Sequence, residues 1–213
     1  MSPMLAGRVD VRSLYAVSRI VAAAIFLISC ASRHSDAARV QRATSQAPDP
    51  AASQSGQEIQ RLTSALAGRW SIRQTIEPRD GMPKGAEGQG TEVWRPGPGG
   101  ISLIEDFDTR VGDRQLSGLG IIWWDNQARG YRVTWCGSAN PRGCVVMSKL
   151  AGWEGGQFVI RDEFERDHKT IVYREVFSDL TPVSFTQTVY QGESGGELKR
   201  MTTIRAAKKK NEL

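Results

Sequence analysis

The chain has 213 residues, of which 39% are hydrophobic and 24% are charged, and its formal net charge is +5. This length suffices for one domain with a core of its own. The positive charge is concentrated in the first 29 residues and in Lys208, Lys209 and Lys210, so the domain between them is close to balanced. The sequence therefore lacks the basic stripe of a nucleic-acid-binding protein, and we expect no nucleic-acid partner.

Residues 1–29 have the pattern of a signal peptide. Three arginines, Arg8, Arg12 and Arg19, precede the uncharged run "IVAAAIFLI" at residues 20–28. A membrane-spanning helix needs about 20 apolar residues, so this run is too short to cross a bilayer. Its length and its basic flank are those of the apolar region of a signal peptide.

The signal peptide ends in Leu27-Ile28-Ser29-Cys30, which resembles the bacterial lipobox. The resemblance implies cleavage before Cys30, lipidation of the Cys30 sulfur and a place in the bacterial cell envelope. Ala31, in the position after the lipidated cysteine, favours the outer membrane if the cell is Gram-negative. The domain is then periplasmic or extracellular. The alternative is a signal peptide cleaved elsewhere, with Cys30 incidental.

A tether is expected at residues 30–56. It lacks aromatic residues, has one branched aliphatic residue and is rich in Ala, Ser, Gln and Pro. Such a segment buries too little apolar surface to offset the entropy of ordering it. We expect a flexible linker here, a domain at residues 57–207 and a basic tail at residues 208–213.

A short helix is expected first in the domain, followed only by strands. Ile59, Leu62 and Leu66 recur at helical spacing, and Gly68 is a plausible stop. The later segments alternate between apolar and polar residues and are separated by turn signals. They give about ten strands, at residues 70–78, 90–95, 100–108, 117–125, 130–136, 144–153, 157–166, 169–178, 183–191 and 197–206.

This order of segments predicts an all-β protein with an antiparallel up-and-down sheet, as a barrel or a sandwich. A barrel is attractive because closure removes exposed strand edges. The entry "LAGRWSI", with Gly68 and Trp70, resembles the Gly-x-Trp entry of lipocalins. The segment "SGLGIIWWDNQARGYRVTWCGS" is similar to a bacterial family of unknown function with a lipocalin-like barrel. The resemblance runs from about residue 62 to residue 207 and implies a fold more than an activity.

Two cysteines remain after Cys30. Cys136 and Cys144 flank a seven-residue loop rich in Gly, Asn and Pro, and they could face each other across a hairpin. Oxidising conditions outside the cytoplasm favour a disulfide between them, with free thiols as the alternative. We expect no metal site, because no histidine or further cysteine lies near enough to complete one.

Several polar side chains alternate in phase with apolar ones and could line an interior cavity. A buried carboxylate needs a partner, and an arginine in phase with apolar residues is the obvious candidate for one. The alternative is that bends and twists expose these charges to water. The cavity candidates are Trp70, Glu105, Asp162, Tyr173, Glu175 and Arg200.

Catalysis is not expected from the sequence motifs. The segment "GESGG" matches hydrolase patterns around Ser194, but the only histidine in the domain, His168, lies in a charged turn. The same position makes His168 a poor haem ligand, so no cofactor is expected. We expect a lipid-anchored barrel that binds a small apolar or amphipathic molecule. The alternatives are a structural or interaction protein with a filled barrel, or an enzyme using Asp162, Glu175 or Glu105 as general acid or base.

Overall fold

The computed structural model describes residues 50–79, 82–140 and 142–209. The expected signal peptide, Cys30 and the tether as far as residue 49 lie outside these residues. Helix α1 spans Pro50–Leu66, so it begins earlier than the sequence pattern predicted. Residues 50–56, assigned above to the tether, are its first turns, because proline is tolerated in the first turn of a helix and the alanines after it favour helix.

The rest of the described chain is an antiparallel β-protein, as predicted. A short 3₁₀ turn, η1 (Pro98–Gly100), precedes β3. The strands are β1 (Gly68–Ile76), β2 (Ala86–Pro96), β3 (Ser102–Val111), β4 (Arg114–Asp125), β5 (Gly130–Gly137), β6 (Cys144–Val146), β7 (Gly152–Glu154), β8 (Gln157–Arg166), β9 (Lys169–Ser178), β10 (Ser184–Glu193) and β11 (Lys199–Lys208).

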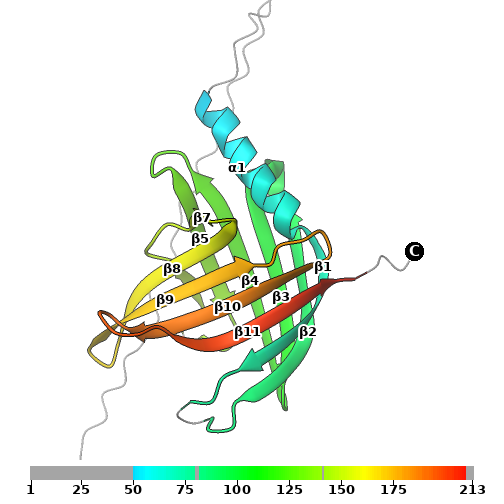
Figure 1. The fold of residues 1–213 in the computed structure, drawn as a ribbon. Coiled ribbons are helices and arrows are strands. Elements are labelled where there is room, and N and C mark those ends of the chain that lie inside the picture. Colours follow the sequence, from blue (N-terminus) through cyan, green and yellow to red (C-terminus); the bar gives the residue numbers. More distant parts are fainter. Residues whose placement is uncertain (1–49, 80–81, 141, 210–213) are drawn as a thin grey trace, which may run out of the picture. The chain divides into compact units, whose positions relative to one another are not determined.

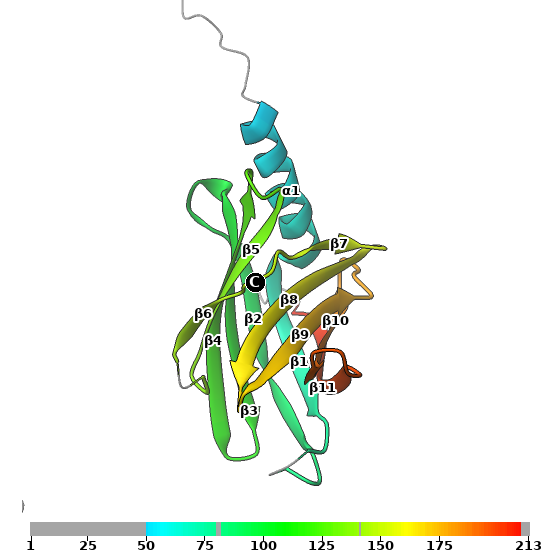
Figure 2. The same ribbon diagram turned by 90° about the vertical axis from the view of Figure 1, so that its left-hand side faces the viewer.

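All eleven strands form one curled sheet in the order β6-β5-β4-β3-β2-β1-β11-β10-β9-β8-β7. Apart from β1 and β11, all paired strands are neighbours in the chain, which confirms the up-and-down topology; β6 and β7 are consecutive in the chain but form the two edges of the sheet. Lys208 lies in β11 opposite Trp70 of β1, so it belongs to the sheet and not to the expected tail. Figure 2 shows β3, β4 and β5 on one side of the fold and β8, β9 and β10 on the other.

The segment at residues 144–153 forms two short strands where the sequence predicted one. Between them the Met147 amide donates to the Val133 carbonyl at 2.9 Å. Ala151 then forms an antiparallel bridge with Tyr131 of β5. Residues 147–151 therefore carry the chain from β5 across to β8, and this connection links the two edges of the curled sheet.

Cys136 and Cys144 lie directly opposite each other on β5 and β6. Their sulfurs are bonded, which confirms the predicted disulfide across a hairpin.

Helix α1 covers one end of the sheet (Figure 1) and contacts β2, β3, β4 and η1. Its apolar face, formed by Ile59, Leu62 and Leu66, is fully buried. The Trp70 indole N–H donates to the Leu66 carbonyl at 2.8 Å and fixes the last turn of the helix. Below the helix lies an aromatic cluster of edge-on and tilted pairs, made of Trp70, Trp94, Tyr131, Phe158, Phe177 and Phe185.

Candidate functional site

Three glutamates lie inside the curled sheet beneath the aromatic cluster. Glu92 of β2 has no exposed surface, and Glu105 of β3 and Glu175 of β9 are 6% and 8% exposed. The strand order places β2 and β3 away from β9. Trp94 of β2 nevertheless packs edge-on against Phe177 of β9, with ring centroids 5.8 Å apart. The acids of the two walls therefore approach each other across the interior, and we call Glu92, Glu105 and Glu175 the interior acid cluster.

Glu175 has two hydrogen-bond donors. The Tyr173 hydroxyl donates to its Oε2 and the Gln187 side-chain amide donates to its Oε1. Burial raises the pKa of Glu175, while these two hydrogen bonds lower it. Burial also raises the pKa of Tyr173 well above 10.0, and the neighbouring Glu175 raises it further. Tyr173 therefore stays protonated and acts as a donor to Glu175.

Glu92 and Glu105 are less well satisfied. Glu92 Oε2 accepts from the Trp94 indole N–H at 3.3 Å, but its Oε1 has no partner, nor has Glu105 Oε1. Burial raises the pKa of Glu92 from 4.5 to about 8; the Trp94 bond lowers it and the charge of Glu175 raises it. Burial, Glu92, Glu175 and Asp106 all raise the pKa of Glu105. The interior acid cluster therefore favours its protonated form.

Among the described residues, no lysine, arginine or histidine is buried. Arg200, the cation expected to face inward, is exposed and forms an ion pair with Glu77 at 2.7 Å. It lies near the start of β11, where Val189 is opposite Thr202 but Tyr190 is opposite Arg200, so the extra residue Met201 interrupts the alternation of β11. The prediction that Arg200 lines the cavity is therefore wrong.

The other expected cavity residues have different fates. Trp70 lies opposite Glu92 in the β1–β2 register, but its N–H is already bonded to Leu66. Asp162 lies opposite Tyr173, and its Oδ1 accepts from the Ser148 amide and hydroxyl, both at 2.7 Å. Asp162 therefore fastens the connection between β6 and β7 to β8. Of the expected cavity residues, Glu105 and Glu175 belong to the interior acid cluster, and Tyr173 is hydrogen-bonded to Glu175.

The sequence reasoning missed Glu92 and Gln187. Gly90, Glu92 and Trp94 alternate in phase within "GTEVWR", so the period-two pattern could have found Glu92. Gln187 is 7% exposed, and its Oε1 is also unpartnered. It alternates with Phe185 in β10 in the same way.

Two glycines of β4 make room for the site. A Cβ atom at Gly120 would lie 2.7 Å from Glu105 Oε2, and one at Gly118 would lie 2.2 Å from the Trp135 ring. The Glu105 carboxyl therefore lies over Gly120, and the indole of Trp135 lies over Gly118. Phe107 packs edge-on against Trp135 at 5.9 Å.

The end of the sheet away from α1 is more open. Phe107, Trp135, Tyr173 and Phe164 take inward positions by alternation, yet all four are only half-buried. The aromatic residues nearer the helix, such as Phe158 and Phe177, are fully buried. Solvent therefore reaches further between the side chains at this end of the sheet than it does beneath the helix.

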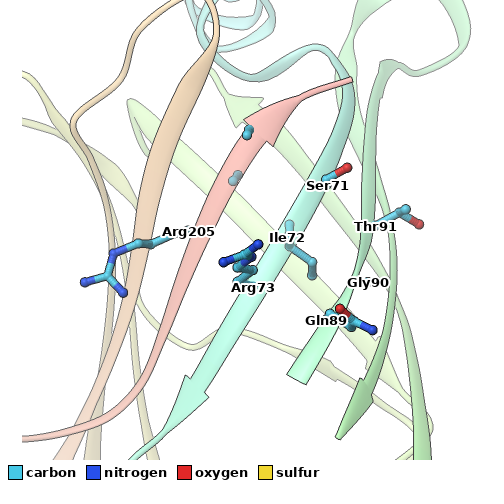
Figure 3. A pocket seen from close by; sticks show the side chains of 9 residues that line it. Ser71, Ile72, Arg73, Gln89, Gly90, Thr91 and Arg205 are labelled. Atoms are coloured by element: carbon cyan, nitrogen blue, oxygen red, sulfur yellow. The ribbon is translucent and has the colours of Figure 1, made fainter. Parts of the chain in front are cut away.

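A hollow of about 670 Å³ lies instead on the outer face of β11, β1 and β2. Figure 3 shows Arg73, Arg205, Gln89 and Thr91 around it. These side chains point away from the core, and none of the buried unpartnered polar atoms among the described residues lies there. We therefore place the candidate site inside the sheet, where polar groups are buried without partners.

Within the described ranges, no group of three or more His, Cys, Asp or Glu side chains is placed to hold a metal. No helix in that part of the chain is long and apolar enough to cross a membrane.

Comparisons with known proteins give little more. No family model matches the chain, and no curated protein matches it. Among solved structures it is similar to a redesigned β-barrel, mFAP0, bound to DFHBI, with 15% identity and a TM-score of 0.37 over 68% of this chain and 99% of that one. It is also similar to EF1p2_mFAP2b bound to DFHBI, with 12% identity and a TM-score of 0.39 over 71% and 99%. A likeness this distant says nothing about the ligand of this chain.

Proposed function

We propose that this protein is a lipid-anchored lipoprotein of the bacterial cell envelope whose barrel binds a small apolar or amphipathic molecule. One observation carries the binding function. Buried oxygens of Glu92, Glu105 and Gln187 have no hydrogen-bond partner among the described residues, and they lie beside aromatic side chains. A buried polar group without a hydrogen bond costs about 1–3 kcal/mol, and a bound molecule that supplies the bond would remove that cost.

The anchor is proposed from the lipobox-like segment that ends at Cys30. Lipid on this residue would hold the barrel at the membrane, with the outer membrane favoured in a Gram-negative cell. A single acyl chain anchors only marginally, whereas several chains on one residue anchor stably. We expect the mature protein to carry acyl mass on Cys30, and a Cys30→Ala variant to leave the membrane fraction. A mature N-terminus without acyl mass would contradict the anchor but not the binding site.

The binding function is tested by native mass spectrometry of the full chain extracted from its own membrane. We expect a co-purifying small molecule that remains bound through mild activation. Well-folded protein that carries nothing, and that binds none of the probes described below, would favour a structural or interaction protein with a filled barrel.

A second candidate, general acid–base catalysis, is favoured by the pKa of Glu92, which burial raises to about 8 and so brings near neutrality. No nucleophile with an orienting base accompanies Glu92 among the described residues. The two functions differ in the fate of the molecule: a binding protein releases it unchanged, whereas an enzyme releases a product. Product release that is lost in Glu92→Gln would favour the enzyme.

A further inference from the structure

We propose that the molecule bound by the interior acid cluster carries a cationic, hydrogen-bond-donating group, of which a primary ammonium is the simplest, on an apolar body. This inference rests on the proposed binding function and names the chemistry of its ligand. It follows from the type of the unpartnered atoms, from the charge of the site and from the aromatic side chains beside it.

Three oxygens of the site have no hydrogen-bond partner among the described residues. They are Oε1 of Glu92, of Glu105 and of Gln187. The donors of the site are already used: the Gln187 amide and the Tyr173 hydroxyl bond to Glu175, and the Trp94 indole N–H bonds to Glu92. The other buried atoms without a partner among the described residues are Gln74 Oε1, the Thr109 hydroxyl, which can donate or accept, and Trp124 Nε1. Because the Gln187 Oε1 can only accept, a ligand that completes the site must donate to it, and Glu92 and Glu105 accept as well once they are ionised.

The charge of the site also favours a cationic ligand. Three carboxyl groups lie together, the described residues contain no buried cation, and Arg200 is bonded outside to Glu77. Buried charges in proteins are stabilised by pairing and hydrogen bonding. An ammonium group carries three donors and one positive charge, so it would supply what Glu92 and Glu105 lack. An anionic ligand would be repelled by any of the three acids that is ionised.

The aromatic side chains suit the same ligand. Trp135 and Phe107 form a half-buried pair, and the Trp135 ring lies in the space left by Gly118. Glu105, Gly120 and Trp135 lie in one row across β3, β4 and β5. A cation close to Glu105 is therefore also near the Trp135 indole, and indole faces attract cations. The apolar body of the ligand would occupy the open end beside Phe107.

Binding of a cation should depend on pH. The groups that act on the cluster are Glu92, Glu105, Glu175, Tyr173, Asp106 and Asp162. Because burial raises the pKa of Glu92 to about 8, the free site retains a proton at neutral pH. A cation stabilises the ionised carboxylate, so its binding releases that proton. The affinity for an ammonium ligand should therefore rise between pH 5 and pH 8.

The test uses three matched probes: 4-phenylbutylammonium, 4-phenylbutanol and 4-phenylbutyrate. They share one apolar body and differ only in the charge and hydrogen-bonding capacity of the end group. Binding to the full chain in zwitterionic lipid nanodiscs is measured by calorimetry at pH 7, with empty nanodiscs as the blank. We expect the ammonium to bind about tenfold or more tightly than the alcohol, and the carboxylate to bind most weakly.

The double variant Glu92→Gln, Glu105→Gln preserves size and shape and removes both charges. It should abolish the preference for the ammonium while leaving the affinity for the alcohol within about twofold. Glu197→Gln is the matched control, because Glu197 is exposed, and it should leave all three affinities unchanged. Circular dichroism of each variant verifies that it is folded.

Two outcomes would overturn the proposal. If the alcohol or the carboxylate binds as tightly as the ammonium, the barrel binds apolar molecules without regard to charge, and only the further inference fails. If no probe binds to folded wild-type protein and none co-purifies with it, the proposed binding function fails as well.

Discussion

Glu92 is a carboxylic acid with no exposed surface, and none of the lysines, arginines or histidines in the described ranges is buried with it. Local alternation with Trp94 determines that Glu92 faces inward. The free-energy cost of ionising it there depends on the burial that the whole barrel produces. Burial makes ionisation unfavourable, because the low-dielectric interior replaces the water that would solvate the charge. The folded protein therefore holds a proton that the unfolded chain releases.

The first prediction concerns the pH dependence of stability. The pKa of Glu92 is about 8 in the folded protein and near 4.5 when unfolded. Between these values unfolding releases a proton, so rising pH favours the unfolded chain by up to about 1.4 kcal/mol per pH unit. The contribution of Glu92 to stability is thus intact below pH 4.5 and lost as the pH rises to about 8.

Replacing Glu92 with Gln removes this dependence and retains the acceptor for Trp94. We expect Glu92→Gln to differ little from wild type at pH 4.5 and to be increasingly more stable up to pH 8, as measured by urea unfolding at each pH. A constant difference between the two proteins across this range would show that Glu92 has an ordinary pKa.

At the scale of elements, helix α1 acts as a cover for one end of the sheet. Its three apolar side chains recur at helical spacing and are all buried, and Tyr131 of β5 donates to Glu58 Oε2 at 2.7 Å. The Arg61 guanidinium also lies 4.3 Å from the centre of the Trp153 ring. The helix is therefore joined to β5 and β7 by polar contacts in addition to apolar packing.

The second prediction tests the cover. Leu62→Ala should lower the free energy of unfolding by about 2–5 kcal/mol, because it leaves a cavity at a position with no exposed surface. Gln60→Ala, at an exposed position of the same helix, should change the stability little. Equal effects of the two substitutions in thermal unfolding would mean that α1 is not docked on the sheet.

The third prediction concerns the outer face of the sheet. Arg73 of β1 lies directly opposite Arg205 of β11, and neither forms an ion pair with any of the described residues. Like charges in opposite positions destabilise a sheet. Arg73→Thr should therefore raise the free energy of unfolding by about 0.2–1 kcal/mol at low salt, and the gain should shrink in high salt.

Arg110→Thr is the matched control for Arg73→Thr, since the exposed Arg110 of β3 lies opposite Gln89 of β2 and Gln115 of β4. It makes the same chemical change in the same sheet without removing a facing cation. A gain in urea unfolding that is equal for both variants would assign the effect to the higher strand propensity of threonine.

At the scale of the whole molecule, the two ends of the sheet meet through residues 144–154. This segment begins at the disulfide to Cys136, continues through the Tyr131–Ala151 bridge and ends in β7 beside β8. The segment contains only two short strands and so few ladder hydrogen bonds. Its covalent link to β5 should therefore contribute more to the stability of this edge than a disulfide inside a broad sheet would.

The fourth prediction follows from that link. Reducing the Cys136–Cys144 disulfide, which closes a loop with a sequence separation of 8, should cost about 2.5 kcal/mol in the chain-entropy view. In reductant, the urea midpoint of wild type should fall to that of the Cys136→Ala, Cys144→Ala variant. Reductant should not change the midpoint of the variant itself. An unchanged wild-type midpoint would show that the hydrogen bonds of residues 147–151 hold this edge without the disulfide.

The sequence by itself determined the elements and their topology. Alternation in segments such as "WSIRQTIEP" marks inward faces residue by residue, and short turns between strands leave antiparallel neighbours as the simplest pairing. The same local reasoning placed Glu105, Tyr173 and Glu175 inside and paired Cys136 with Cys144. It could also have placed Glu92, because that signal is equally local. The lipobox-like segment before Cys30 stays a prediction of the sequence.

Only the tertiary structure decided which of the inward-facing polar groups contact one another and which are exposed or bonded elsewhere. Arg200 has the parity of an interior residue, but the register shift at Met201 and its place near the start of β11 bring it to Glu77. Asp162 is drawn to Ser148 because residues 147–151 pass over β8. Whether an acid inside a barrel has a cation beside it depends on contacts between distant strands. Period-two alternation contains no information about those contacts, since it fixes the face of each residue but not its neighbours across the interior.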